Sequence, residues 1–215
     1  QIPNKIEQLP VLKIGENAFA DTKVKSVTLP ASCTEVEWFA FYGCYAMTGI
    51  WVEKDNSHYS SDSGVLFNKD KTILVSAPSG IDGSYSIPYG VLTIGKNAFG
   101  DCLYLTSVTI PDSVTSIGYE AFYGCSGLIN VVLSEGVKTI SSNAFQNCFN
   151  LTNVVLSEGL TSIGYEAFAS CRALTSVTIP GSVTGIGGYA FSGCSNLTDL
   201  IISEGVTSIS GTYVF

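Results

Sequence analysis

The sequence contains little positive charge and almost no histidine. Ten lysines and arginines stand against eighteen aspartates and glutamates, which gives a formal net charge of −8, and His58 is the only histidine. An acidic chain without a basic cluster is a poor nucleic-acid ligand, because the neutralisation of phosphates supplies most of that affinity. A Ser-His-Asp or Cys-His site would have to use His58, so the scarcity of histidine argues against an enzyme.

Long apolar runs and the common metal and nucleotide motifs are also missing. No stretch reaches the roughly 18 consecutive apolar residues of a transmembrane helix, although 46% of the residues are hydrophobic. The patterns C-x-x-C, H-E-x-x-H and G-x-x-x-x-G-K-[ST] do not occur, so zinc, thiol-redox and nucleotide chemistry are unsupported. We therefore expect no membrane insertion and no cofactor. Residues 1–10 lack the charged start and apolar stretch of a signal peptide, so secretion cannot be read directly from the sequence.

Internal repetition, in contrast, is abundant. A 23-residue unit runs from Leu105 to Gly127, and its best marker is a phenylalanine that usually follows an alanine. From Phe99 onward this phenylalanine returns every 23 residues, whereas the step from Phe19 to Phe41 is 22 and the next step is 58. The whole column consists of Phe19, Phe41, Phe99, Phe122, Phe145, Phe168 and Phe191, with a degenerate copy at Val214.

Each unit also contains the pattern L-x-x-V-x-I, which alternates with a period of two. In the Leu105 unit, Val108 and Ile110 share one face of a short strand, and Thr109 lies on the other. Val, Ile and Thr suit a pleated strand, and a single unit cannot bury its apolar face without a neighbouring copy. The sequence therefore predicts stacked units whose strands form a parallel sheet.

Six of the seven cysteines occupy one column, three residues after the phenylalanine. Parallel side chains in register keep their Cβ atoms farther apart than the roughly 3.5–4.5 Å that a disulfide needs. We therefore expect reduced cysteines that pack with the phenylalanines as a structural ladder. The cysteine column contains Cys44, Cys102, Cys125, Cys148, Cys171 and Cys194.

The full pattern from Leu105 to Cys125, L-x-x-V-x-I-P-x-x-V-x-x-I-G-x-x-A-F-x-x-C, resembles the 23-residue leucine-rich repeat of BspA-like surface proteins. The resemblance implies an α/β, mostly β fold: a right-handed leucine-rich-repeat solenoid with a concave parallel β-sheet. It also implies a bacterial cell-surface or secreted protein, since members are linked to adhesion to host matrix proteins and to other cells. The family shares no catalytic motif.

Two segments depart from the repeat. Residues 1–22 read as an N-terminal partial repeat or cap, with Ile6 and Leu9 as strand candidates, and residues 53–84 form an insertion. Inside the insertion, two apolar runs flank the polar residues 68–72, which predicts one β-hairpin. Residues 85–215 are regular repeats, and we expect residues 1–215 to form a single leucine-rich-repeat domain.

The outward face of the strands is the best candidate for binding a protein partner, such as a host matrix protein or another cell's surface. It is small, polar and uncharged, with a few apolar points, and an aromatic anchor often dominates such contacts. In the alternative, Thr and Val are simply good strand formers and Trp51 packs under the hairpin. The candidate residues are Trp51, Thr109, Asn130, Val132, Asn153, Val155, Thr178 and Ile201.

Three further readings stay open. An acidic row (Asp112, Glu135, Glu158 and Glu204) is either a solvated turn or a site for a cation or basic partner. The carboxylates of residues 53–84 match no calcium-loop pattern, so a calcium site there has little support. The chain could also be a stalk or spacer of a larger surface protein, with no ligand of its own.

Overall fold

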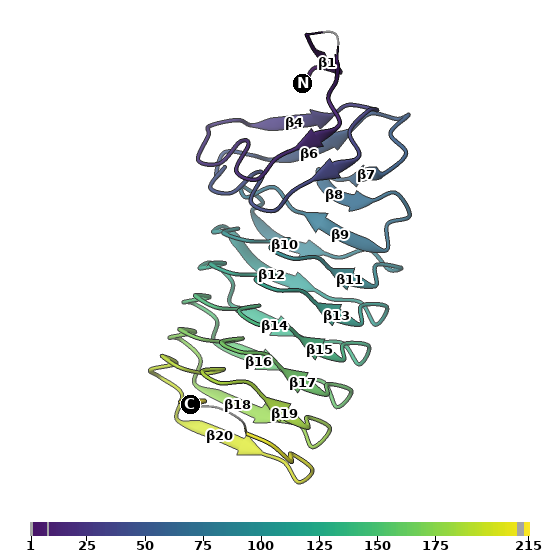
Figure 1. Cartoon of the computed structure of the whole chain (residues 1–215). Coiled ribbons are helices and arrows are strands. Elements are labelled where there is room, and N and C mark those ends of the chain that lie inside the picture. The colour runs from purple at the N-terminus through teal and green to yellow at the C-terminus, as the bar shows by residue number, and fades with distance from the viewer. Residues whose placement is uncertain (1, 8, 210–212) are drawn as a thin grey trace.

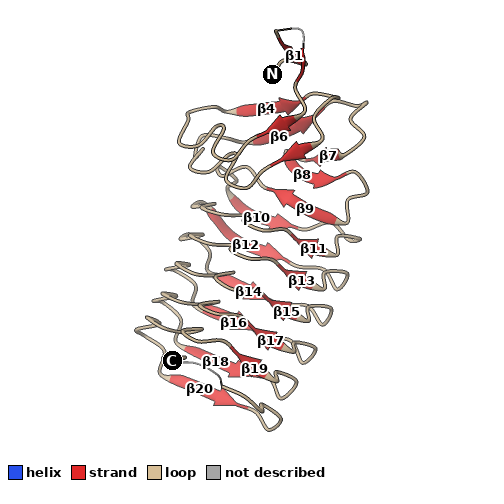
Figure 2. Ribbon diagram, viewed as in Figure 1, coloured by secondary structure: helices blue, strands red, loops and turns tan. Residues whose placement is uncertain are grey.

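The chain forms a solenoid of stacked strands and turns, seen here in a computed structural model that describes residues 2–7, 9–209 and 213–215 (Figure 1). None of these residues lies in a helix (Figure 2), and so no described helix has the length and apolarity of a membrane crossing. The mostly-β solenoid with parallel sheets, predicted from the repeat, is confirmed.

Each turn of the solenoid contributes one strand to a main row. Equivalent residues of successive repeats pair in register, as Val131 does with Val154, because the repeats have equal length. Within the row, β10, β12, β14 and β16 form one parallel sheet, while β4–β6 and β18–β20 form two parallel pairs. The row consists of β4 (Ser26–Leu29), β6 (Gly49–Val52), β10 (Gly83–Ser86), β12 (Leu105–Thr109), β14 (Asn130–Val132), β16 (Asn153–Val155), β18 (Ser176–Ile179) and β20 (Asp199–Ile202).

A second row of shorter strands lies on another side of the coil. From β9 to β19 these strands are parallel and in register, as in the pairing of Ile94 with Ile117. The row contains β3 (Lys13–Ile14), β5 (Glu35–Val36), β9 (Ile73–Ser76), β11 (Thr93–Ile94), β13 (Ser116–Ile117), β15 (Thr139–Ile140), β17 (Ser162–Ile163) and β19 (Gly185–Ile186).

The insertion is an antiparallel meander that ends in the second row. The predicted hairpin around residues 68–72 is confirmed, because β8 (Val65–Asn68) pairs antiparallel with β9. A further strand, β7 (Tyr59–Asp62), pairs with β8 through a two-residue turn. Ser63 and Gly64 both have positive φ, 50° and 79°, as a type I′ turn requires. The sequence did not indicate β7 because Tyr-Ser-Ser-Asp lacks the apolar alternation of a half-buried strand.

The meander also separates two buried apolar clusters. Leu66 packs into an N-terminal cluster that includes Ile2 and Phe41, whereas Val65 and Phe67 pack into the cluster of the regular repeats. Successive side chains of a strand point to opposite faces, so β8 serves both clusters at once.

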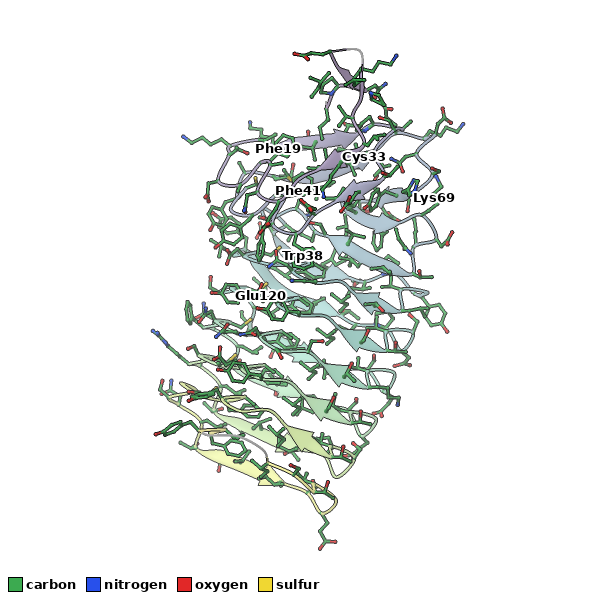
Figure 3. The ribbon with its side chains drawn as sticks, viewed as in Figure 1. Phe19, Cys33, Trp38, Phe41, Lys69 and Glu120 are labelled. Carbon is green, nitrogen blue, oxygen red and sulfur yellow. The ribbon has the colours of Figure 1, made fainter. Side chains whose placement is uncertain are left out.

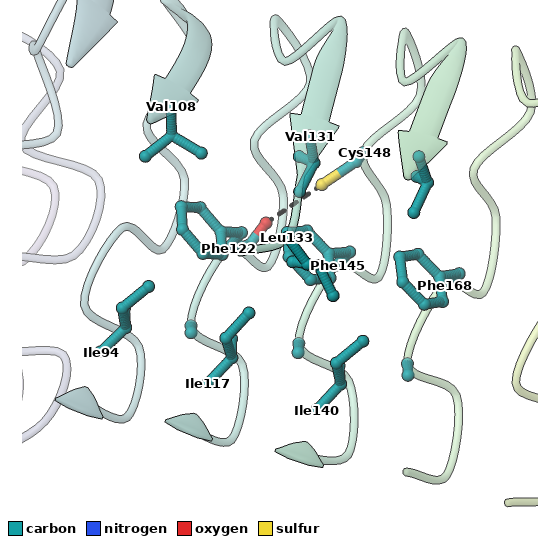
Figure 4. Packing of buried hydrophobic residues seen from close by; sticks show 14 of the residues in the cluster. Ile94, Val108, Ile117, Phe122, Val131, Leu133, Ile140, Phe145, Cys148 and Phe168 are labelled. Atoms are coloured by element: carbon teal, nitrogen blue, oxygen red, sulfur yellow. Dashed lines mark hydrogen bonds between the residues drawn. The ribbon is translucent and has the colours of Figure 1, made fainter. Parts of the chain in front are cut away.

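Stacked phenylalanine rings form the centre of the regular repeats (Figure 4). Ring centroids are 4.8 to 5.2 Å apart from Phe99 to Phe191, and neighbouring rings lie within 7° of parallel. The prediction that Val214 is the last copy of the column is wrong. Phe215 stacks on Phe191 at 5.6 Å, and the Val214 carbonyl accepts the Phe191 N–H as alanine carbonyls do in the other turns. The last step is therefore 24 residues long.

The thiols of the cysteine column donate hydrogen bonds to backbone carbonyls of the phenylalanine column. The thiol of Cys148 donates to the Phe122 carbonyl at 3.2 Å (Figure 4), and equivalent bonds are made in other repeats by Cys125, Cys171 and Cys194. All seven cysteines are buried and free. Each of these phenylalanine carbonyls also accepts the N–H of the cysteine in its own turn, so the thiol is its second donor and links it to the next turn.

At the N-terminus, β1 (Lys5–Ile6) and β2 (Leu9–Pro10) form a small antiparallel ribbon. Ile6 and Leu9, the predicted strand candidates, are both exposed on it. Ile2 is buried instead, and its N–H donates to the Thr28 carbonyl. The apolar contact with the first repeats therefore comes from a residue that the repeat pattern did not mark.

Candidate functional site

The outward residues of the main row form what we call the main strand face. Strand alternation creates it: on β14, Val131 is fully buried and Val132 is 54% exposed. All eight residues predicted to bind a partner are exposed on this face, namely Trp51, Thr109, Asn130, Val132, Asn153, Val155, Thr178 and Ile201.

The structure brings most of these residues together, but not all. Thr109, Val132 and Val155 lie side by side in register on β12, β14 and β16, with Asn130 and Asn153 beside them. Thr178 pairs with Ile201 on β18 and β20. Trp51 pairs with Thr28 in a separate sheet, and the meander stands between it and the others (Figure 1).

The indole of Trp51 lies along its own strand. A Cβ atom on Gly49 would be 2.7 Å from the indole Nε1, so the absence of a side chain at Gly49 makes room for the ring. Trp51 remains 46% exposed, and the meander therefore does not enclose it.

A hollow opens on this face where the sheet is interrupted. Among the described residues, β16 and β18 share no strand pairing although they follow each other in the row. The hollow has a volume of about 220 Å³, and its lining includes Asn153, Val155, Glu158, Thr178 and Pro180. Three of the predicted residues thus surround one depression that is large enough for a side chain.

Carboxylates border the face without occupying it. Asp112, Glu135, Glu158 and Glu204 are exposed just beyond the ends of their strands. On the described outward positions of the main row, only Asp199 is charged. Apart from Asp199, the face is therefore uncharged and partly apolar, and the four carboxylates form an acidic rim beside it.

A groove at the insertion was not foreseen. It has a volume of about 190 Å³ and is lined by residues 36–42, by residues 73, 75–77 and 79, and by residues 95–97 and 100. Trp38, which is exposed, forms part of its wall (Figure 3). Trp38 stands in the third position before the phenylalanine, where other units have glutamate, lysine, tyrosine, serine or glycine. The tryptophan at this position was visible in the sequence, but the residues that lie near it across the insertion were not.

A hydrogen bond between Tyr42 and Asp101 crosses the same insertion. This bond, together with partial burial, raises the pKa of Tyr42 to about 12. Burial raises the pKa of Asp101, and the bond from Tyr42 opposes that rise. The two side chains therefore hold together turns that are 58 residues apart in the phenylalanine column.

Without the Tyr42 hydroxyl, the free energy of unfolding should fall less steeply as the pH rises above 10. The pKa of Tyr42 is higher in the folded protein than its ordinary value of 10, so its stabilising contribution is complete below pH 10 and disappears as pH rises toward 12. Urea unfolding of the wild type and of Tyr42→Phe between pH 9 and about 12 measures the difference. The free energy of unfolding should fall more steeply with pH in the wild type, and the difference in slope should correspond to at most one proton per molecule. Equal slopes would contradict the bond.

Asn56 and His58 are two further polar residues of the insertion that have partners within the chain. Asn56 is fully buried; its Nδ2 donates to the carbonyls of Pro30 and Cys33, and its Oδ1 accepts the N–H groups of His58 and Tyr59. The exposed ring of His58 contacts the Ser57 hydroxyl at 3.0 Å. In the part of the chain that the structure describes, no three His, Cys, Asp or Glu side chains form a group that could hold a metal ion.

The chain is similar to solved bacterial leucine-rich repeat proteins. A cell-surface protein of Faecalibacterium prausnitzii shares 36% identity with a TM-score of 0.81, over 91% of this chain and 52% of that one. The pneumococcal vaccine antigen PcpA shares 25% identity with the same TM-score, over 92% of this chain and 49% of that one. This chain thus spans about half the length of these proteins.

The family profile called BspA type leucine rich repeat region matches residues 2–81 and 85–215 in six copies. No curated protein matches the chain. Proteins of this family are generally non-enzymatic repeat proteins that serve as protein-interaction modules of bacterial surface proteins. The chain belongs to the BspA-type leucine-rich repeat family.

Proposed function

We propose that the chain is a non-catalytic adhesion module that binds another protein through the main strand face. The observation that carries the proposal is the group of exposed apolar residues on an otherwise neutral polar face. Val132 and Val155 are adjacent in register, and Ile201 is 59% exposed on β20. Exposed apolar side chains that cluster on a rigid sheet mark interaction surfaces more often than scattered ones do.

The rim indicates what kind of partner fits. Four exposed carboxylates border the face, and the chain carries a formal charge of −8. A partner with an apolar centre and surrounding lysines or arginines would complement both features. The hollow beside Val155 and Glu158 suits an apolar side chain of the partner with a basic neighbour.

We also propose that the protein acts at or outside a bacterial cell surface. The support comes from the relatives, because the F. prausnitzii protein is described as a leucine rich cell surface protein. The partner would then be a host matrix protein or a component of another cell's surface.

An array of immobilised extracellular-matrix proteins and polysaccharides tests the proposal. On a matrix protein that binds the wild type, Val132→Asp and Val132→Lys should both weaken binding at least about ten-fold, because either charge must be desolvated in the interface. Trp51→Ala should weaken binding as well, since it removes the largest exposed side chain of the face. Salt should also weaken binding, because the rim acts through charge.

Leu92→Asp is the matched control. Leu92 is an exposed apolar residue next to β11 of the second row, so its replacement adds the same charge on another side of the solenoid. It should leave binding within about two-fold of the wild type. Equal losses for Leu92→Asp and Val132→Asp would show that general charge matters and that the main strand face does not.

A spacer role is the second candidate. The stacked rings from Phe99 to Phe215 form a continuous support along the regular repeats. The chain also spans only about half the length of the F. prausnitzii protein and of PcpA. A protein that binds nothing on the array would support the spacer role and count against adhesion.

A further inference from the structure

Trp38, Lys96 and Tyr119 hold equivalent positions in three turns. The meander of β7, β8 and β9 lies between the turn of Trp38 and the turn of Lys96 (Figure 1). The Lys96 Nζ lies 2.9 Å from the centroid of the Trp38 ring and 4.7 Å from that of Tyr119. The ammonium group is therefore held in place by two aromatic rings. It lies at the edge of the groove, whose lining contains both Trp38 and Lys96.

Lys96 has no carboxylate partner among the described residues. Ion pairs there involve Lys13 and Lys71 only, although the chain contains eighteen acidic residues. An ammonium group has three N–H donors, and ring faces offer no oxygen to accept them. Lys96 is therefore a positioned cation whose hydrogen-bonding capacity is open to an anion.

Asn97, the next residue, supplies an unused donor. Its Nδ2 is buried and has no hydrogen-bond partner among the residues that the structure describes. In the repeat of Asn143, the equivalent Nδ2 donates to Gln146 at 2.8 Å, but glycine stands at the matching position here, Gly100. Asn97 and Gly100 both line the groove. Rotation about the soft χ2 torsion of Asn97 would turn the amide toward an acceptor there.

The groove also has exposed aromatic surface and a hydroxyl. Lys96 lies over one side of the Trp38 ring, yet Trp38 remains 56% exposed, so other parts of the indole are open. The Tyr42 side chain lines the groove as well; its hydroxyl is bonded to Asp101 and can still accept a hydrogen bond. An open aromatic surface beside amide, hydroxyl and ammonium groups suits a ring with apolar C–H faces and a polar edge.

We propose that the groove binds an acidic sugar residue of a polysaccharide. The sugar carboxylate pairs with Lys96, the ring lies against Trp38, and the hydroxyls bond Asn97 and Tyr42. A volume of about 190 Å³ lies below the roughly 300–1,000 Å³ of pockets for drug-sized ligands, which fits one sugar ring of a chain. The side chain of an acidic peptide would use Lys96 but would leave the aromatic surface and the other polar groups without a role.

Tryptophan fluorescence provides the test, since Trp38 and Trp51 are the two tryptophans of the chain. In a Trp51→Phe background, Trp38 reports on the groove alone. The probes are trigalacturonate, its fully methyl-esterified form and hexaglutamate. We expect a saturable change with trigalacturonate, and affinity at least about ten-fold lower for the ester, which lacks the charge. No saturable change with trigalacturonate, equal affinity for the ester, or tighter binding of hexaglutamate would overturn the proposal.

Substitutions of Lys96 separate binding from stability. Lys96→Gln should lower the affinity for trigalacturonate about ten-fold or more, and Lys96→Arg, which keeps the charge and the contact with the rings, should restore most of it. Thermal unfolding shows whether either variant is folded. If Lys96→Gln does not fold, the affinity of Lys96→Arg and the comparison with the ester still test whether the charge of Lys96 binds the sugar carboxylate. A folded Lys96→Gln protein with wild-type affinity would refute the role of Lys96.

Discussion

Replacement of Phe145 by alanine should lower the free energy of unfolding by about 3–5 kcal/mol. Phe145 is fully buried between Phe122 and Phe168, with ring centroids 5.0 and 5.1 Å away. Removal of one ring loses its transfer free energy and leaves a cavity that two neighbouring rings cannot fill, because their backbones are fixed by strands in register. Circular dichroism during urea unfolding measures the change.

Phe149 provides a matched control for this loss. It is the same residue type four positions later, but it is exposed and contacts Arg172 at 4.9 Å. Phe149→Ala should cost no more than about 1 kcal/mol. Similar losses for the two alanine variants would mean that the phenylalanine column is not the central support of the solenoid.

Val131→Asp should destabilise the protein strongly, whereas Val132→Asp should be as stable as the wild type. The two valines are neighbours on β14, and Val131 is fully buried while Val132 is 54% exposed. A carboxylate at position 131 would enter the apolar cluster without a partner, at a cost of more than about 4 kcal/mol. Whole domains are stable by only about 5–15 kcal/mol, so a loss of this size removes a large part of the stability and should lower the midpoint of unfolding sharply.

Circular dichroism and thermal unfolding of the two variants check this prediction. Val132→Asp should change the free energy of unfolding by no more than about 0.5 kcal/mol, as is usual for exposed positions. If Val132→Asp lowered the free energy of unfolding as much as Val131→Asp does, the outward side of β14 would be part of the core, and its valine would not be available to a partner.

The sequence was sufficient to predict features that repeat at each turn. The phenylalanine spacing and the alternation in L-x-x-V-x-I indicate which positions of one unit are buried. Because the units stack in register, the same positions are buried in the next unit. Exposure of Val132 beside buried Val131 follows from that alternation alone.

Features that occur once were harder to predict. The strand β7 was missed because its four residues are mostly polar, and Phe215 was missed because the last step contains one more residue than the others. The groove could not be found, since the contact of Trp38 with Lys96 depends on how the meander places two turns that are distant in sequence. The separation of Trp51 from the cluster around Val132 has the same cause.

The most direct test of the account is site-specific photo-crosslinking to a matrix protein identified on the array. A benzophenone amino acid replaces Val132 or Val155 on the main strand face, and Leu92 or Tyr165 elsewhere on the exposed surface. We predict crosslinked complexes from positions 132 and 155 and none above background from positions 92 and 165. Crosslinks from 92 or 165 alone would show that the partner binds another side of the solenoid, and would contradict recognition by the main strand face.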